Sequence, residues 1–332
     1  MYMIDQFAEC FIETFDKSSR RKFQRWLTTR PTTTNWIIAA DFALRDKNRP
    51  GDCFAFTLIP NDLHPKEFAA EVQRNLPKDL KKTKDLDAAA ASWLRNPRHF
   101  HVLIPMRQDR VLYGNGPAGT TELDNIRGIL KATIKQLVEL ERGPDQIKRF
   151  KATFHKAQAK GFNVELFTDL TLLSYYLAII TVILCRERKL DAVSWYCDRD
   201  SMTTFCDRVV WDYAMENFVG LASVLNVDCQ RLIPVVAIPD VSSGKEVMWF
   251  DHYIRAADWL AGALAAWNRE ENQLPGEHPK YIRLIEDVIA DSENTVVLPV
   301  HVDDSEMNVR LVEVTRTPAG DTAIARAIIP SA

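Results

Sequence analysis

Glycine and proline are scarce in this chain, with 12 and 16 positions among 332 residues. Together with 46% hydrophobic and 26% charged residues, these low counts argue against a fibrous, low-complexity or mostly disordered chain. The net charge of −3 rules out a globally basic surface, so any nucleic-acid contact must come from local clusters of Lys and Arg. The length allows one large α/β domain with additions, or two smaller domains.

The six cysteines include no C-x-x-C pair, and several lie in apolar runs, where a free thiol behaves as a small hydrophobic group. This usage, and an N-terminus without a basic leader, predicts a reducing, cytoplasmic location. Long hydrophobic runs are lacking too. The longest uncharged stretch, residues 170–185, is shorter than the roughly 20 residues that cross a bilayer, so we expect a buried helix and no membrane contact.

Hydrophobic periodicity predicts a mixed order of helices and strands. We expect strands over 35–44, 52–60, 100–105, 110–113, 191–198 and 231–241. We expect helices over 1–30, 65–94, 120–160 with a break near Gly143-Pro144, 168–188, 203–225 and 251–267.

This element order predicts a ribonuclease-H-like mixed sheet flanked by helices, with helical insertions. The expected organisation has three parts. They are an N-terminal helical segment (1–35), the ribonuclease-H-like domain (36–268) and a C-terminal α+β appendage (269–332).

Three aspartates stand where such a sheet places catalytic carboxylates. Asp41 lies within the apolar first strand, Asp198 ends the strand over 191–198, and Asp258 interrupts the apolar stripe of the last helix. A carboxylate in such surroundings is costly to bury unless a cation or partner compensates it. Because carboxylate oxygens suit Mg²⁺ or Mn²⁺, which polarise a phosphodiester and activate water, we expect these three residues to be catalytic and to bind metal.

Asp251 is a further candidate metal ligand, because it lies two helical turns before Asp258 on nearly the same side of the helix. Arg255 offers an alternative. It follows Asp251 by four residues and precedes Asp258 by three, so an ion-pair ladder within the helix would satisfy both carboxylates without metal. Asp200 precedes Ser201 and a helix, which predicts an N-cap.

The motifs I-I-A-A-D-F-A-L, V-S-W-Y-C-D and A-D-W-L-A-G resemble those of a bacterial domain family of unknown function with a ribonuclease-H-like fold. That family begins with an Asp on its first strand, usually as Asp-Glu-Ser-Gly. It carries a mid-chain strand ending in Asp and closes with a helix written like Q-L-A-D-L-I-A-G. The resemblance spans about residues 36 to 268, and its closest match is 257–262.

The resemblance implies a divalent-metal-dependent nuclease, or a related phosphodiester-processing protein, acting on nucleic acid in a defence or mobile-element setting. In that case Asp41 and Asp198 would bridge the metals and Asp258 would hold the second one.

The chain departs from the family pattern in two places. Phe42-Ala43-Leu44 replaces the Glu-Ser-Gly, and the helix over 170–185 has no inward Glu, for which Asp169 is a weak substitute. The alternative is therefore a catalytically degenerate ribonuclease-H-like binding or assembly module. Its C-terminal appendage would offer a surface to a protein partner.

Two other motifs indicate different chemistry. Residues 114–119 match G-x-G-x-x-G, but Pro117 removes an amide donor and no second parallel strand follows, so a connector loop is preferred to a dinucleotide site. His99 and His101 share one face of a predicted strand, as metal ligands do. No Cys or acidic partner stands at ligand spacing near them, which favours a structural role.

A basic run without acidic residues lies in the first helical segment. Its candidate nucleic-acid contacts are Arg20, Arg21, Lys22 and Arg25. The interleaved Phe23 and Trp26 suit stacking on bases. The competing interpretation is a solvated helix face whose aromatic side chains pack inward.

Overall fold

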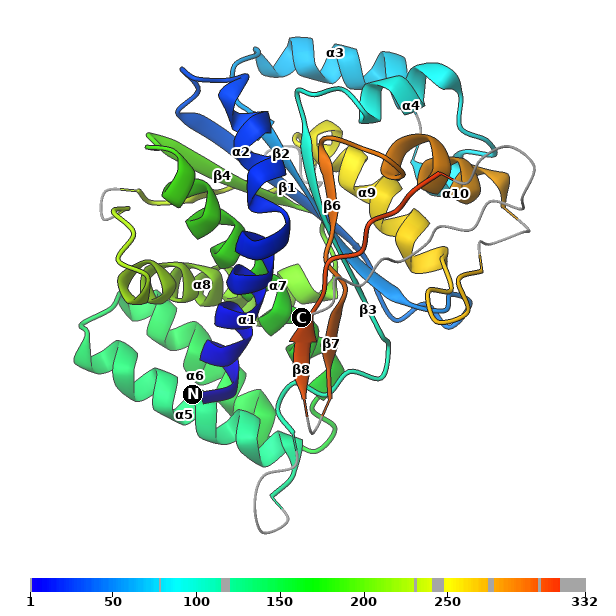
Figure 1. Cartoon of the computed structure of the whole chain (residues 1–332). Coiled ribbons are helices and arrows are strands. Elements are labelled where there is room, and N and C mark those ends of the chain that lie inside the picture. Colours follow the sequence, from blue (N-terminus) through cyan, green and yellow to red (C-terminus); the bar gives the residue numbers. More distant parts are fainter. Residues whose placement is uncertain are drawn as a thin grey trace.

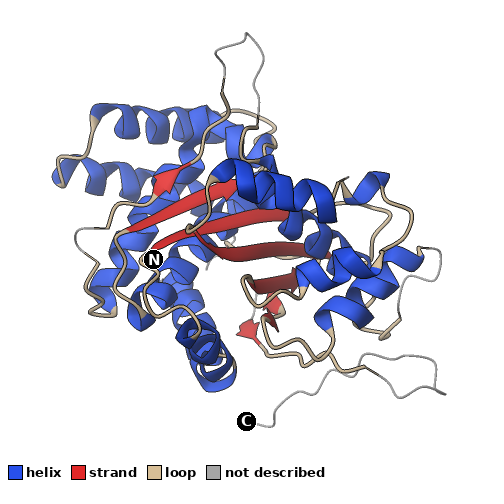
Figure 2. Cartoon of the chain, turned by 90° about the horizontal axis from the view of Figure 1, so that it is seen from above, coloured by secondary structure: helices blue, strands red, loops and turns tan. Residues whose placement is uncertain are grey.

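The computed structural model shows a mixed α/β protein in which one eight-stranded sheet carries helices on both faces (Figures 1 and 2). The structure describes residues 2–77, 79–114, 120–229, 232–240, 248–273, 278–303 and 306–316. Mixed α/β architecture, with a mixed sheet between helices, is confirmed by these elements.

The strands follow the order β5-β4-β1-β2-β3-β7-β8, and β6 also pairs with β3. They are β1 (Asn35–Ala43), β2 (Asp52–Pro60), β3 (Phe100–Met106), β4 (Ala192–Cys197), β5 (Val235–Val236), β6 (Thr295–Val297), β7 (Val300–Val302) and β8 (Met307–Val309). The first three form an antiparallel meander, whereas β4 runs parallel to β1 and β5 runs parallel to β4. At the other edge of the sheet, β6 and β7 run parallel to β3, and β8 runs antiparallel to β7.

The helices of one face surround the apolar α7. They are α1 (Tyr2–Ser18), α2 (Arg20–Thr28), α5 (Glu122–Glu139), α6 (Pro144–Gln158), α7 (Val164–Glu187) and α8 (Ser201–Val224). By length and composition α7 could cross a membrane, but 89% of its apolar window is buried inside the protein. The predicted buried helix is therefore confirmed, and its apolar surface is explained by the core.

The opposite face carries a second core around α9, drawn in yellow in Figure 1. Its helices are α3 (Pro65–Asn75), η1 (Leu80–Lys82), α4 (Ala88–Leu94), α9 (Asp251–Ala266), α10 (Pro279–Arg283) and η3 (Leu284–Ile289). The α9 helix packs across β1 and β2. Its face is rich in alanine, which allows this helix to lie close to the sheet.

Three sequence predictions need correction. The single helix expected over 65–94 is divided into α3, η1 and α4, because Pro77 cannot donate a helical hydrogen bond. Residues 110–113 form no strand, because the side chain of Arg110 points inward and joins a buried ion network. The strand expected over 231–241 shortens to Val235–Val236 among its described residues, where Pro234 and Pro239 lack ladder donors.

The C-terminal residues, expected as an appendage, extend the same sheet and both cores. Strands β6 and β7 pair with β3, and Val296 and Val300 are buried with the α7 side of the protein. Tyr281 and Leu284 are buried against the α9 side. The side chain of Thr14 donates to the carbonyl of Val309 at 3.2 Å, so the first helix and the last strand are neighbours.

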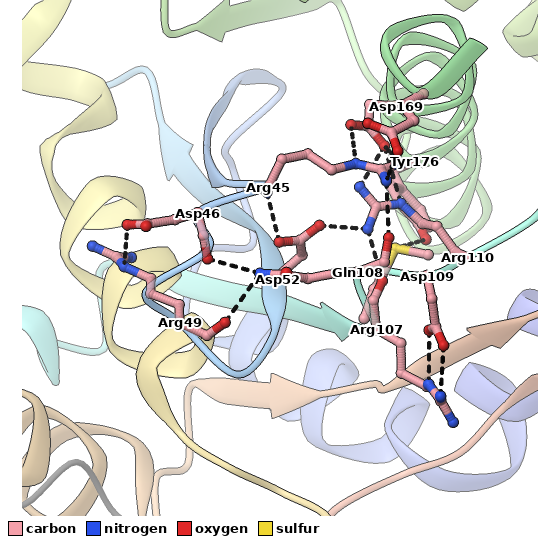
Figure 3. Close-up of polar contacts among 12 residues, drawn as sticks. Arg45, Asp46, Arg49, Asp52, Arg107, Gln108, Asp109, Arg110, Asp169 and Tyr176 are labelled. Atoms are coloured by element: carbon pink, nitrogen blue, oxygen red, sulfur yellow. Dashed lines mark hydrogen bonds and ion pairs between the residues drawn. The ribbon is translucent and has the colours of Figure 1, made fainter.

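A buried ion network fixes one end of the sheet (Figure 3). The Arg110 guanidinium lies between Asp52, at 2.5 Å, and Asp169, which also receives Arg45 at 3.2 Å. The backbone amide of Arg45 donates to Asp52 at 2.7 Å. The network joins the start of β2, the segment after β3 and helix α7, and it holds the connection between β1 and β2 in place.

Gln108 adds two further bonds to that connection, donating to the carbonyls of Asp46 at 2.9 Å and Arg49 at 3.1 Å. The loop 44–51 is therefore anchored to the segment that follows β3 (Figure 3).

We predict that Arg110→Met lowers the free energy of unfolding by about 3–5 kcal/mol, because it leaves two buried carboxylates without their common cation. Urea unfolding at pH 7 measures this loss. Arg107→Met is the matched control: Arg107 pairs with Asp109 at the surface, where a salt bridge contributes at most about 1 kcal/mol. Equal losses in the two variants would contradict the role assigned to the network.

Candidate functional site

Strand alternation places Asp41 and Asp198 on the face of the sheet that α9 covers. Ile37 and Ala39 belong to the α9 core, and Asp41 follows them at a spacing of two residues. The register pairs Ala40 with Cys197, and the amide of Asp198 donates to the carbonyl of Ala40 at 3.1 Å. The two aspartates therefore come from adjacent parallel strands, at the same end of the sheet.

Asp258 reaches the same place from α9. Asp41, Asp198 and Asp258 line one pocket with a volume of about 190 Å³. The loop 44–51 contributes Asp46 and Arg49 to its wall, and the lining is completed by Phe42, Ala43, Leu44, Leu80, Lys81, Ala261 and Gly262.

Few groups of the protein compensate the three carboxylates. The amide of Phe42 donates to Asp41 at 2.6 Å, and the amide of Leu80 donates to Asp258 at 3.2 Å. Among the residues that the structure describes, no Lys, Arg or His forms an ion pair with any of the three aspartates.

Burial raises the pKa of each aspartate, and repulsion from other pocket aspartates adds to the rise for Asp41 and Asp198. The pKa of Asp41 lies well above its ordinary value, first because the side chain is buried and then because Asp258 and Asp198 are close. Burial also raises the pKa of Asp198, with Asp200 and Asp258 adding to the effect. The pKa of Asp258 is raised by burial and by the charge of Asp79, against the lowering influence of the Leu80 amide, Arg255 and Lys81.

The other acidic candidates lie outside this pocket lining. Asp251 pairs with Arg255, which also contacts Asp79 at 2.5 Å, so the predicted ladder forms with Asp79 in place of Asp258. Asp200 caps α8 by accepting from the amides of Met202 and Thr203, as predicted. Asp169 is held by two arginines in the ion network, and is not a free ligand.

Most of the predicted nucleic-acid contacts have partners within the protein. Arg20 pairs with Glu187 at 2.6 Å, Lys22 donates to the carbonyl of Ser292 at 2.8 Å, and Arg25 pairs with Glu293 at 3.2 Å. Arg21 is exposed and has no recorded partner in the described part of the chain. The intervening Phe23 and Trp26 are buried, so these rings pack inward and do not offer a stacking surface.

His99 and His101 are structural residues of the protein interior. Both rings are buried, with His101 in strand β3 and His99 directly before it, and His101 bonds to Thr57 at 3.0 Å and to the carbonyl of Leu94 at 2.9 Å. Burial lowers the pKa of His101 to about 4, and burial together with the neighbouring His101 holds the pKa of His99 well below its ordinary value. Within the G-x-G-x-x-G motif, residues 115–119 lie outside the described residues.

The sequence analysis missed a surface triad, His301, Asp303 and Glu306, at the turn between β7 and β8. Among the described residues it is the one group of three or more His, Cys, Asp or Glu residues whose ligand atoms all lie within 4.8 Å of one another. The carboxylate oxygens of Asp41, Asp198 and Asp258 are therefore spread more widely. The spacing H-x-D-x-x-E was the available signal for the triad.

No protein-family model matches the chain, and neither a curated protein nor a solved structure shows significant similarity to it.

The raised pKa of Asp41 predicts how stability depends on pH. Because the folded protein holds this proton more tightly than the unfolded chain, stability falls as the pH rises from about 3.8 through the raised pKa. The variant Asp41→Asn removes this titration. Its stability relative to the parent protein should therefore increase between pH 4 and pH 8 in the presence of EDTA, measured by urea unfolding.

Asp109→Asn is the control for this measurement. Arg107 lowers the pKa of Asp109, so this exposed variant should change in the opposite direction and by less. If Asp41→Asn and the parent protein had the same pH dependence, the carboxyl of Asp41 would not be perturbed as described.

Proposed function

We propose that this protein has a ribonuclease-H-like fold and is a divalent-metal-dependent nuclease, or a related phosphodiester-processing protein, that acts on nucleic acid. The observation that carries the proposal is the convergence of Asp41, Asp198 and Asp258 in one pocket, where none of the three forms an ion pair with a described Lys, Arg or His. The strand order β3-β2-β1-β4-β5, with only β2 antiparallel to its neighbours, supports the fold assignment.

The chemistry of the donor set fits Mg²⁺ or Mn²⁺. All three side chains offer carboxylate oxygens, the ligands preferred by hard cations, and no thiol or imidazole is among the pocket's lining residues. The carboxylate oxygens of the three aspartates do not all lie within 4.8 Å of one another. This spacing suits a cation that keeps part of its water shell, as Mg²⁺ does. A divalent cation bound there would polarise a phosphodiester and lower the pKa of a water molecule.

The chain's own residues fix the ligands. Asp41 and Asp198 are held by adjacent strands, and the amide of Phe42 orients the carboxylate of Asp41. The amide of Leu80 orients Asp258. Ligands carried on packed strands and a packed helix retain their positions more precisely than ligands on free loops.

One observation favours a second candidate, a catalytically degenerate binding module. Helix α7 brings a carboxylate toward this end of the sheet, but Asp169 is neutralised by Arg45 and Arg110. The pocket lining contains one further carboxylate, Asp46, but it pairs with Arg49 at 3.3 Å. The lining therefore offers no fourth carboxylate that is free to bind a metal. Such a module would bind nucleic acid or a protein partner without cleaving it.

A cleavage assay tests the proposal. Labelled single-stranded and duplex DNA and RNA are incubated with the purified protein and millimolar Mg²⁺ or Mn²⁺. We expect cleavage that Asp41→Asn, Asp198→Asn and Asp258→Asn each reduce by at least about 100-fold, because each removes a metal ligand. Asp109→Asn, outside the pocket, should retain the activity.

Activity unchanged in the three pocket variants would contradict the assignment of the site. Binding of the substrates without cleavage, under every metal condition, would favour the degenerate module.

A further inference from the structure

A basic turn borders the aspartate pocket. The short helix η1 follows α3, and its residues Leu80 and Lys81 both line the pocket beside Asp258. The turn has the sequence L-K-K-T-K over residues 80–84, so three lysines lie within four positions. It therefore brings positive charge to the edge of a pocket whose other ionisable groups are mostly acidic.

Several bonds hold this turn in place. The amide of Leu80 donates to Asp258 at 3.2 Å, and the ammonium of Lys280 donates to the carbonyls of Leu80 at 2.7 Å and Thr83 at 2.8 Å. Gly262 permits the close approach, because a Cβ atom at this position would lie 2.3 Å from Leu80 Cδ2. The turn is thus fixed against α9, and the backbone of Lys81 is fixed with it.

Most of the neighbouring cations are already engaged, and Lys84, the last lysine of the turn, does not line the pocket. Lys82 pairs with Asp79 at 3.0 Å, and Arg255 pairs with Asp79 and Asp251. Arg49 donates to the carbonyl of Gly262 at 3.3 Å and pairs with Asp46.

Lys81 differs from these cations. Its side chain is exposed, and no hydrogen bond or ion pair is recorded for it with any described residue. Its ammonium keeps three donors on a flexible stem, which suits it to a phosphate as a point charge.

We propose that Lys81 is a positioning residue that binds a backbone phosphate of a phosphodiester polyanion at the mouth of the aspartate pocket. The inference rests on the proposed function and names a contact of its substrate. Three carboxylates repel a phosphate, so a cation beside them that forms no ion pair with a described residue compensates part of that repulsion. The fixed turn lets Lys81 make the contact without closure of a lid.

Fluorescence anisotropy with end-labelled oligonucleotides tests this contact. Single-stranded and duplex DNA and RNA are titrated with protein in Ca²⁺, a hard cation used here in place of Mg²⁺, over a range of NaCl concentrations. We expect Lys81→Met to raise the Kd roughly tenfold near 0.1 M salt and to reduce the slope of log K against log salt by about 1. Lys82→Met, whose ammonium pairs with Asp79, is the matched control and should change both quantities less.

The outcomes separate this inference from the proposed function. Equal binding by Lys81→Met and the parent protein would overturn the contact, even if metal-dependent cleavage is present. Failure of the parent protein to bind any oligonucleotide would also overturn it. If the parent protein binds oligonucleotides but cleaves none of them, loss of binding in Lys81→Met would support the phosphate contact and contradict the proposed nuclease activity.

Discussion

The crowding of three like-charged carboxylates in one pocket, one of them buried and two half-buried, is the constraint on which the functional interpretation depends. Removing Asp41 wholly and Asp198 and Asp258 partly from water is costly, so the pKa of each rises, and repulsion between the pocket aspartates adds to the rise for Asp41 and Asp198. Three backbone amides, those of Phe42, Leu80 and Arg199, offset only part of this cost. A protein that keeps such a cluster either binds protons at the carboxylates or binds a cation. Clusters of carboxylates with perturbed pKa values are typical of functional sites.

The surrounding architecture holds the cluster from several directions. Alternation along β1 and β4 directs two carboxylates to the α9 face, and Gly262 lets the η1 turn pack against α9 beside the third. At the end of the sheet, Arg110 pairs with both Asp52 and Asp169, and this network anchors the loop 44–51 (Figure 3), which contributes residues to the pocket lining. The two groups differ, because Asp52 and Asp169 form ion pairs with Arg110, whereas no described Lys, Arg or His forms an ion pair with the pocket aspartates.

The sequence was sufficient to predict the elements with strong periodicity and the three pocket aspartates. An Asp among Ile, Ala and Phe is conspicuous because strands with buried faces rarely carry a charge without a reason. Contacts between distant segments were not predictable. Arg110 pairs with residues that lie 58 and 59 positions away in the sequence, and Lys280 bonds to a carbonyl 200 positions away. The engagement of Arg20, Lys22 and Arg25 likewise depends on partners elsewhere in the chain, which local charge patterns do not reveal.

Titration with Mg²⁺ or Mn²⁺, followed by thermal unfolding, tests most directly whether the aspartate pocket is a cation site. The account predicts that either ion raises the Tm, with a stabilisation of about 2.7 kcal/mol at a concentration 100-fold above the Kd. EDTA should reverse the shift, and Asp198→Asn should abolish it, whereas His301→Ala should retain it because the surface triad is a separate group. No shift at millimolar metal, or an equal shift in Asp198→Asn, would contradict the central claim.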